Sequence, residues 1–247
     1  MDMDNKHSLF FPQLIRHELN SGRWRRKRHQ NKAWRITNFV FYLTVALLVT
    51  TYFSLKVNLE LKYIWNVCWG IPWIAFGISI GNIKIESSEG TIGWWLALPY
   101  PRLALISSKF WAMILRSLKI MCFIFLAIIA FAAYAVLISK GLTWNGFQNF
   151  LAYGLEPILL TLLALPFMVS VGTLAGVLRV TRWRQAMSML WVIWGLSWGL
   201  GSSTGIFTIV NHTRGFIIIG SVFLASFVIS LILLRIAAWI LEKQLDI

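Results

Sequence analysis

Six apolar stretches that carry almost no charge constrain the fold of this chain more than any other feature. Each is as long as the roughly 20 apolar residues that a helix needs to cross a bilayer. Only 13% of the 247 residues are charged, whereas soluble domains average about 25%. The pattern predicts an all-α, polytopic integral membrane protein with six transmembrane helices. The predicted spans cover residues 36–56, 62–82, 117–138, 155–178, 186–206 and 215–237.

The fifth apolar stretch, 185–213, is too long for one simple span. It contains the small and polar residues Gly201 to Gly205, which predict an irregular or re-entrant piece after the fifth helix. Such backbone is viable at membrane depth only where protein or water covers it.

The segment 1–35 precedes the first span and is predicted to be cytoplasmic, amphipathic and basic. Its apolar residues recur at helical spacing, which predicts a short interfacial helix that lies flat on the membrane. A basic run, 23–29, follows this helix, and each base near anionic lipid contributes about 1 kcal/mol. We interpret the run as an anchor on membrane lipid, with a nucleic-acid or regulatory role as the alternative. The apolar residues of the helix are Phe10, Phe11, Leu14, Ile15 and Leu19.

The distribution of bases predicts the orientation of the chain in the cell membrane. With both termini in the cytoplasm, 19 Lys and Arg residues fall in inner segments and 4 in outer segments. Inner loops carry this excess in membrane proteins. We therefore expect a multi-pass protein of the cell (plasma) membrane with cytoplasmic N- and C-termini. The same count explains the net charge of +14 without nucleic acid as a partner.

These boundaries divide the chain into three parts. A cytoplasmic segment, 1–35, leads into a six-span transmembrane domain, 36–238, and a cytoplasmic tail, 239–247. The longest cytoplasmic connection within the domain is the loop 84–109 between the second and third spans.

Motifs for catalysis, nucleotide binding and metal binding are missing from the sequence. There is no phosphate-binding loop of the P-loop type, and the four histidines lack the spacing of zinc ligands. Cys68 and Cys122 lie in apolar runs, where free cysteines behave as small buried hydrophobes. We therefore predict no catalytic residue, no metal site and no cofactor in this chain, and we do not expect it to be an enzyme.

Polar and aromatic residues within the spans are candidates for a translocation path. Glu156 is the only acid that touches a span, and acids at that depth are costly. Alternatively, Pro157 opens the fourth helix and Glu156 lies at the outer interface. Tryptophans recur every three or four residues on the second and fifth spans, which predicts one shared face on each helix. These faces serve either helix packing or an aromatic wall for an amphipathic substrate. The candidates for the path are Trp69, Trp73, Glu156, Trp194, Trp198 and Ser202.

The stripe on the second span starts one turn earlier, at Trp65, and the stripe on the fifth span starts at Trp191. The prediction of a shared face covers both of these residues as well.

The loop 84–109 carries two acids, Glu86 and Glu89, although inner loops favour bases. An apolar piece, 92–98, follows the acids, and Pro99 and Pro101 break the chain after it. This pattern predicts a short interfacial helix with an acidic end beneath the membrane. Such a helix suits docking on a soluble partner, with a plain connecting loop as the alternative.

The spacing of residues in this loop resembles the cytoplasmic loop of type-2 ABC exporter permeases, the ABC-2 membrane family. The six-span layout and the N-terminal amphipathic helix are also similar. The matching positions in the loop are Glu86, Gly90, Thr91, Leu96, Leu98, Pro99, Arg102 and Lys109.

The resemblance implies that the loop carries a coupling helix that docks on a separate ABC ATPase subunit. It also implies a homodimer, or a heterodimer with a second permease, with ATP and Mg bound by the partner ATPase. The ATPase-coupling residues implied in this way are Glu86, Glu89, Gly90, Thr91, Trp94, Leu98 and Arg102.

The function expected from this resemblance is export of an amphipathic substrate, such as a drug, an antimicrobial peptide, a lipid-linked molecule or a polysaccharide. The chain would form the path, and the partner would hydrolyse ATP. The alternative is a non-transporting membrane immunity or sensing protein that binds a peptide or another partner. An ATPase with a phosphate-binding loop encoded beside this gene would favour the exporter.

Overall fold

The structure, a computed structural model, describes residues 11–19, 32–56, 61–90, 93, 97, 100–138, 144–192 and 215–243. Every regular element in these ranges is a helix. Two of the helices, residues 11–19 and 186–192, carry no label in the text below. The remaining elements are α2 (Lys32–Lys56), the 3₁₀ helix η1 (Leu61–Trp69), α3 (Gly70–Ser88), α5 (Arg102–Ile138), α6 (Trp144–Val180), the 3₁₀ helix η2 (Arg182–Gln185) and α8 (Gly215–Lys243).

Four of the described helices are long and apolar enough to cross a membrane. They are Tyr63–Ser88, Arg102–Ile138, Trp144–Val180 and Phe223–Lys243, and α2 adds the shorter apolar stretch Ile36–Tyr52. The prediction of an all-helical, multi-pass membrane protein is therefore confirmed at this level. The count of six spans stays a prediction, because most of the predicted fifth span lies outside the described residues.

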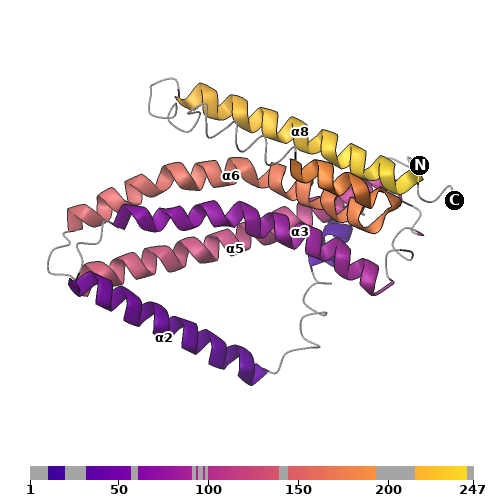
Figure 1. Cartoon of the computed structure of the whole chain (residues 1–247). Coiled ribbons are helices and arrows are strands. Elements are labelled where there is room, and N and C mark those ends of the chain that lie inside the picture. The colour runs from indigo at the N-terminus through magenta and orange to yellow at the C-terminus, as the bar shows by residue number, and fades with distance from the viewer. Residues whose placement is uncertain are drawn as a thin grey trace.

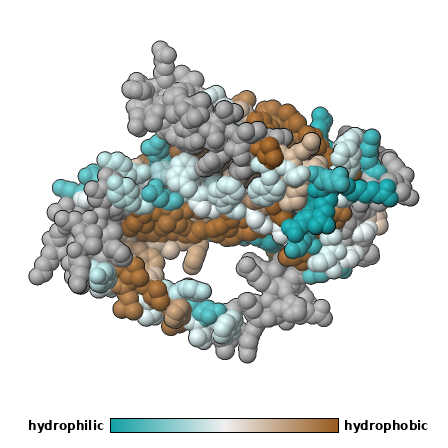
Figure 2. Space-filling model, in the orientation of Figure 1, coloured by the Kyte–Doolittle hydropathy of each residue, from teal (hydrophilic) through white to brown (hydrophobic). Residues whose placement is uncertain are grey.

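The long helices run roughly side by side, and α2 diverges from them (Figure 1). Helix α6 is central, since it packs on α3, α5 and α8, whereas the main neighbour of α2 is α5. Helix α8 ends at the end of the molecule where α3 ends and α5 begins (Figure 1). Brown apolar residues run along the middle of the molecule and teal residues gather towards that end (Figure 2), as expected for helices that emerge from lipid.

Helix α5 begins well before the predicted third span. It starts at Arg102 and has 37 residues, or about 55 Å at 1.5 Å per residue. The hydrocarbon layer is about 30 Å thick, so the first turns of α5 extend beyond it. The predicted loop 84–109 is correspondingly shorter, because 84–88 belong to α3 and 102–109 to α5. Charged residues such as Lys109 and Arg116 indicate where the membrane span begins, but the helix α5 continues through them.

Helix α6 also differs from the expectation. It runs from Trp144 to Val180 with Pro157 and Pro166 inside it, so Pro157 does not open the helix as one interpretation of Glu156 assumed. Proline is tolerated within membrane helices because neighbouring groups satisfy the backbone that it leaves unpaired. Glu156 therefore lies within a continuous helix, and its side chain is exposed.

Two glycines allow α6 to approach α3 closely. A Cβ added at Gly172 would lie 2.7 Å from the backbone oxygen of Phe76, and one at Gly176 would lie 2.9 Å from the Ile83 side chain. Small residues four apart form such contacts between membrane helices, where van der Waals packing drives association. This contact joins the central helix α6 to α3.

A second contact fixes η1 against the start of α6. The Trp65 indole donates a hydrogen bond to the Phe150 carbonyl at 2.9 Å and stacks on the Phe150 ring with centroids 5.0 Å apart. Gly154 makes room for it, since a Cβ there would lie 2.2 Å from the indole ring. Trp65 thereby joins η1 to the start of α6.

Trp65→Phe is expected to lower the free energy of unfolding by about 1 kcal/mol, because the hydrogen bond to Phe150 is lost while most of the ring packing stays. The measurement is thermal or denaturant unfolding in detergent. Trp111→Phe is the matched control, because Trp111 is exposed, and surface changes usually stay within about 0.5 kcal/mol. Equal effects of the two substitutions would contradict a bridging role for Trp65.

Candidate functional site

A buried cluster of three charged side chains lies where α3 ends and α5 begins. The Lys109 Nζ atom of α5 donates hydrogen bonds to Glu86 Oε1 at 2.6 Å and to Glu18 Oε1 at 2.8 Å. Glu86 belongs to α3, and Glu18 belongs to the helix 11–19. We call Glu18, Glu86 and Lys109 the ion-pair cluster.

Each member of the ion-pair cluster is almost completely shielded from solvent. Lys109 is 3% exposed, Glu86 is 6% exposed and Glu18 is 7% exposed. A charge in such surroundings is costly unless it is paired and hydrogen-bonded. The three side chains therefore depend on one another, and the cluster fixes three chain segments that are far apart in the sequence.

The residues just after the cluster end α3 and start the connecting segment. Glu89 caps α3, and its backbone N–H bonds to the Ile85 carbonyl. Gly90 follows with a φ of 69°, the left-handed conformation that commonly ends a helix and that glycine adopts without a penalty. The chain thus turns sharply out of α3, and the Glu89 side chain is left exposed.

The structure separates the two acids that the sequence placed together in an exposed docking surface. Glu86 is buried in the ion-pair cluster, so that expectation is wrong for its side chain, whereas Glu89 is exposed. The reason is where α3 ends: Glu86 lies in its last turn and pairs with Lys109, whereas Glu89 is the cap that follows Ser88. Gly90 forms the turn, and Arg102 is the first residue of α5. Thr91, Trp94 and Leu98 lie outside the described residues.

The candidates for a translocation path are only partly described. Trp69 and Trp73 are about two-fifths exposed, and Glu156 is exposed on α6. Trp194, Trp198 and Ser202 lie outside the described residues.

The predicted tryptophan stripe on the second span is wrong. Trp65 is buried, whereas Trp69 and Trp73 are exposed, because 61–69 form a 3₁₀ helix. With three residues per turn, positions four apart lie about 120° apart around the axis. The ring of Trp191 meets Phe76 of α3 edge-on, with centroids 5.6 Å apart, which favours helix packing for that residue.

Sequence reasoning named Lys109 only as part of a loop and missed Glu18 altogether. A usable signal was present, since Glu18 follows Leu14 and Ile15 by four and three residues and so lies on the apolar side of its helix. An acid at such a position needs a buried partner. The identity of that partner, 91 residues away, depends on the tertiary fold.

The described residues contain no group of three or more His, Cys, Asp or Glu side chains that could hold a metal ion. Comparisons with family models, curated proteins and solved structures found no match. The geometry of the ion-pair cluster and of the turn above it is therefore the basis for a functional assignment.

Proposed function

We propose that this chain is the permease subunit of an ABC exporter, coupled to a separate ATPase subunit. The observation that carries the proposal is the ion-pair cluster at the base of the connecting segment. It supports a mechanical role, because Glu86 at the end of α3 and Lys109 near the start of α5 are bonded directly. A push on the segment between them would reach both helices together.

The helix 11–19 adds a third element to this lever. Glu18 accepts a hydrogen bond from Lys109, so a displacement of α3 or α5 would also move the helix 11–19. In the proposed mechanism, closure of the ATPase on ATP moves the segment near Glu89, and α3 and α5 tilt as a unit. Access to the path would then change from the inner to the outer side. The described contacts supply the rigid connection that such a step requires.

The course of the long helices supports the six-span layout. Helices α6 and α8 run in the same direction (Figure 1). Two neighbouring helices of the same direction need an odd number of crossings between them. A span within 181–214 meets this need and agrees with the predicted fifth span at 186–206.

The first test of the function is copurification. The tagged chain is purified from its own host in mild detergent, and the proteins that come with it are identified. A stoichiometric ATPase with a phosphate-binding loop supports the exporter. A preparation that stays free of ATPase under gentle crosslinking contradicts it and favours the immunity or sensing protein.

Glu89→Lys is expected to reduce copurification of the ATPase and to abolish stimulation of its activity, because it reverses the charge of an exposed side chain beside the connecting segment. Folding should be preserved, since surface substitutions cost about 0.5 kcal/mol or less. The measurements are the yield of ATPase per permease and the ATP turnover. Lys84→Glu, also exposed on the last turns of α3, controls for charge reversal as such. Unchanged stimulation in Glu89→Lys would contradict the assignment of this segment.

A further inference from the structure

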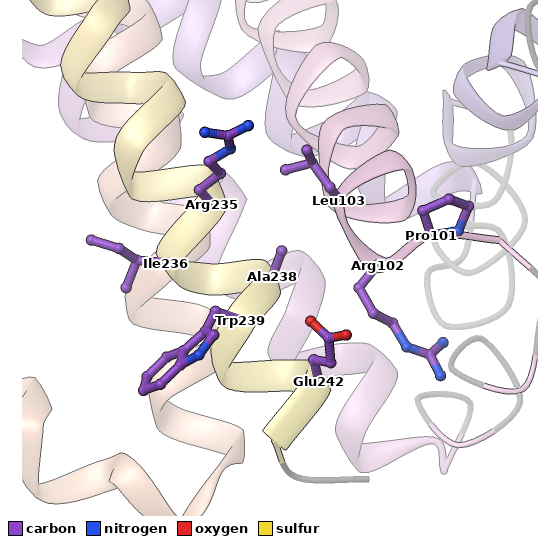
Figure 3. A pocket seen from close by; sticks show the side chains of 8 residues that line it. All are labelled: Pro101, Arg102, Leu103, Arg235, Ile236, Ala238, Trp239 and Glu242. Atoms are coloured by element: carbon purple, nitrogen blue, oxygen red, sulfur yellow. The ribbon is translucent and has the colours of Figure 1, made fainter. Parts of the chain in front are cut away.

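A cleft lies between the first residues of α5 and the last two turns of α8 (Figure 3). Its volume is about 570 Å³. The residues that line it are Pro101, Arg102, Leu103, Arg235, Ile236, Ala238, Trp239 and Glu242.

One face of α8 forms most of the cleft. Arg235, Trp239 and Glu242 are four and seven residues apart, so they lie along the same side of the helix. Arg235 and Glu242 are exposed. Figure 3 shows Glu242 extending from α8 towards the start of α5, whereas the Arg235 side chain extends along α8 away from Glu242. The opposite wall holds Arg102.

Charges of both signs therefore line one cleft. Within the part of the chain that the structure describes, Arg235 and Glu242 form no salt bridge with each other or with another residue. Their positions are seven residues apart, or about 10 Å along the helix axis. A ligand that carries a negative and a positive group can reach both side chains, whereas a simple anion meets the repulsion of Glu242.

The rest of the cleft is apolar and suits a lipid. Leu103, Ile236 and Trp239 each expose about two-fifths or more of their surface beside the charged groups. The Lys243 Nζ atom lies 4.6 Å from the centroid of the Trp239 ring. Tryptophan and basic side chains at the end of apolar helices are typical of the headgroup level of a membrane. The ligand is thus expected to have both a charged head and an apolar body.

We propose that this cleft binds a phospholipid whose headgroup carries a primary ammonium, as phosphatidylethanolamine does. Arg235 binds the phosphate, and Glu242 accepts hydrogen bonds from the ammonium group. The acyl chains lie against Leu103 and Ile236. A choline headgroup offers no N–H donor to Glu242, and a glycerol headgroup offers no positive charge. The proposal does not depend on the exporter function.

The test measures lipid binding to the full chain, purified in detergent and stripped of lipid. Short-chain phosphatidylethanolamine, phosphatidylglycerol and phosphatidylcholine are added separately, and bound lipid is counted by native mass spectrometry. Inorganic phosphate and free phosphoethanolamine are tested by thermal unfolding. We expect preferential retention of the ethanolamine lipid and no response to the two soluble compounds. Equal retention of all three lipids, or an equal response to a soluble compound, would overturn the proposal.

Two substitutions assign the binding to this cleft. Arg235→Gln is expected to weaken ethanolamine-lipid binding about tenfold, the usual effect of losing a charge-assisted hydrogen bond. Glu242→Gln is expected to remove the preference for ethanolamine over glycerol lipid, a ratio that a general loss of folding does not produce. Lys84→Gln removes an exposed base outside the cleft and should leave both values unchanged. Equal effects of Arg235→Gln and Lys84→Gln, or an unchanged preference in Glu242→Gln, would refute the site.

Discussion

Replacing Lys109 by methionine is expected to lower the free energy of unfolding by about 3–5 kcal/mol, the usual cost of removing one partner from a buried ion pair. Methionine preserves much of the length of the side chain, so packing changes little. The two carboxylates of Glu18 and Glu86, each now without Lys109, remain in a site that is shielded from water. The measurement is equilibrium or thermal unfolding of the purified protein in detergent.

The uncharged version of the same cluster separates charge from packing. Glu18→Met, Glu86→Met and Lys109→Met together should recover most of the loss, because replacing a whole buried ion-pair group by apolar residues of similar volume is often neutral or stabilising. Lys119→Met is the matched control, since Lys119 is exposed on the same helix. A triple variant as unstable as Lys109→Met alone would show that shape, and not unbalanced charge, explains the effect.

The triple variant also tests the proposed lever. If the bonds between Glu86, Lys109 and Glu18 transmit motion, a stable protein without them should bind the ATPase and stimulate it less. A triple variant that is both stable and fully stimulated would leave the cluster with a role in folding alone.

Gly172→Ala is expected to destabilise the protein by about 1–3 kcal/mol, the usual cost of overpacking. The new Cβ would lie 2.7 Å from the backbone oxygen of Phe76 and 2.9 Å from the Cβ of Ser79. Neither atom can rotate away, so α3 and α6 must separate. Unfolding in detergent measures the change, and a loss of the apolar contacts along both helices should accompany it.

Two other glycines form a graded control for Gly172. Gly176→Ala meets the flexible end of the Ile83 side chain at 2.9 Å and should cost less than Gly172→Ala. Gly77→Ala on α3 meets no atom within 4 Å and should be neutral or stabilising by up to about 1 kcal/mol, because glycine weakens a helix interior. The reverse order of stabilities would contradict the close packing of α3 on α6.

The helices could be predicted from the sequence because hydrophobicity alone determines membrane insertion. Runs of about 20 apolar residues identified the regions of α3, α5, α6 and α8. Their ends could not be predicted in the same way. Helix α5 starts at Arg102 and α6 passes through Pro157, since charge and proline mark the limits of a span better than the limits of a helix.

The candidate site shows the same limit. The loop between the second and third spans was recognised from Glu86, Glu89 and Gly90, and the turn at Gly90 follows from its residue type. The burial of Glu86 depends on the ion-pair cluster. In it, Lys109 bonds to Glu86, 23 residues away in the sequence, and to Glu18, 91 residues away. Tertiary packing brings them together, and local periodicity carries no information about such pairs.

The divergence of α2 affects the order in which the protein is built. Its main neighbour is α5, to which it is linked by a hydrogen bond of 3.1 Å between Thr51 Oγ1 and the Tyr134 hydroxyl. During translation, α2 is complete before the first residue of α5 has been made. Helix α2 must therefore be made without its main neighbour. Docking of α2 waits until the ribosome has reached α5, the third long helix in the chain.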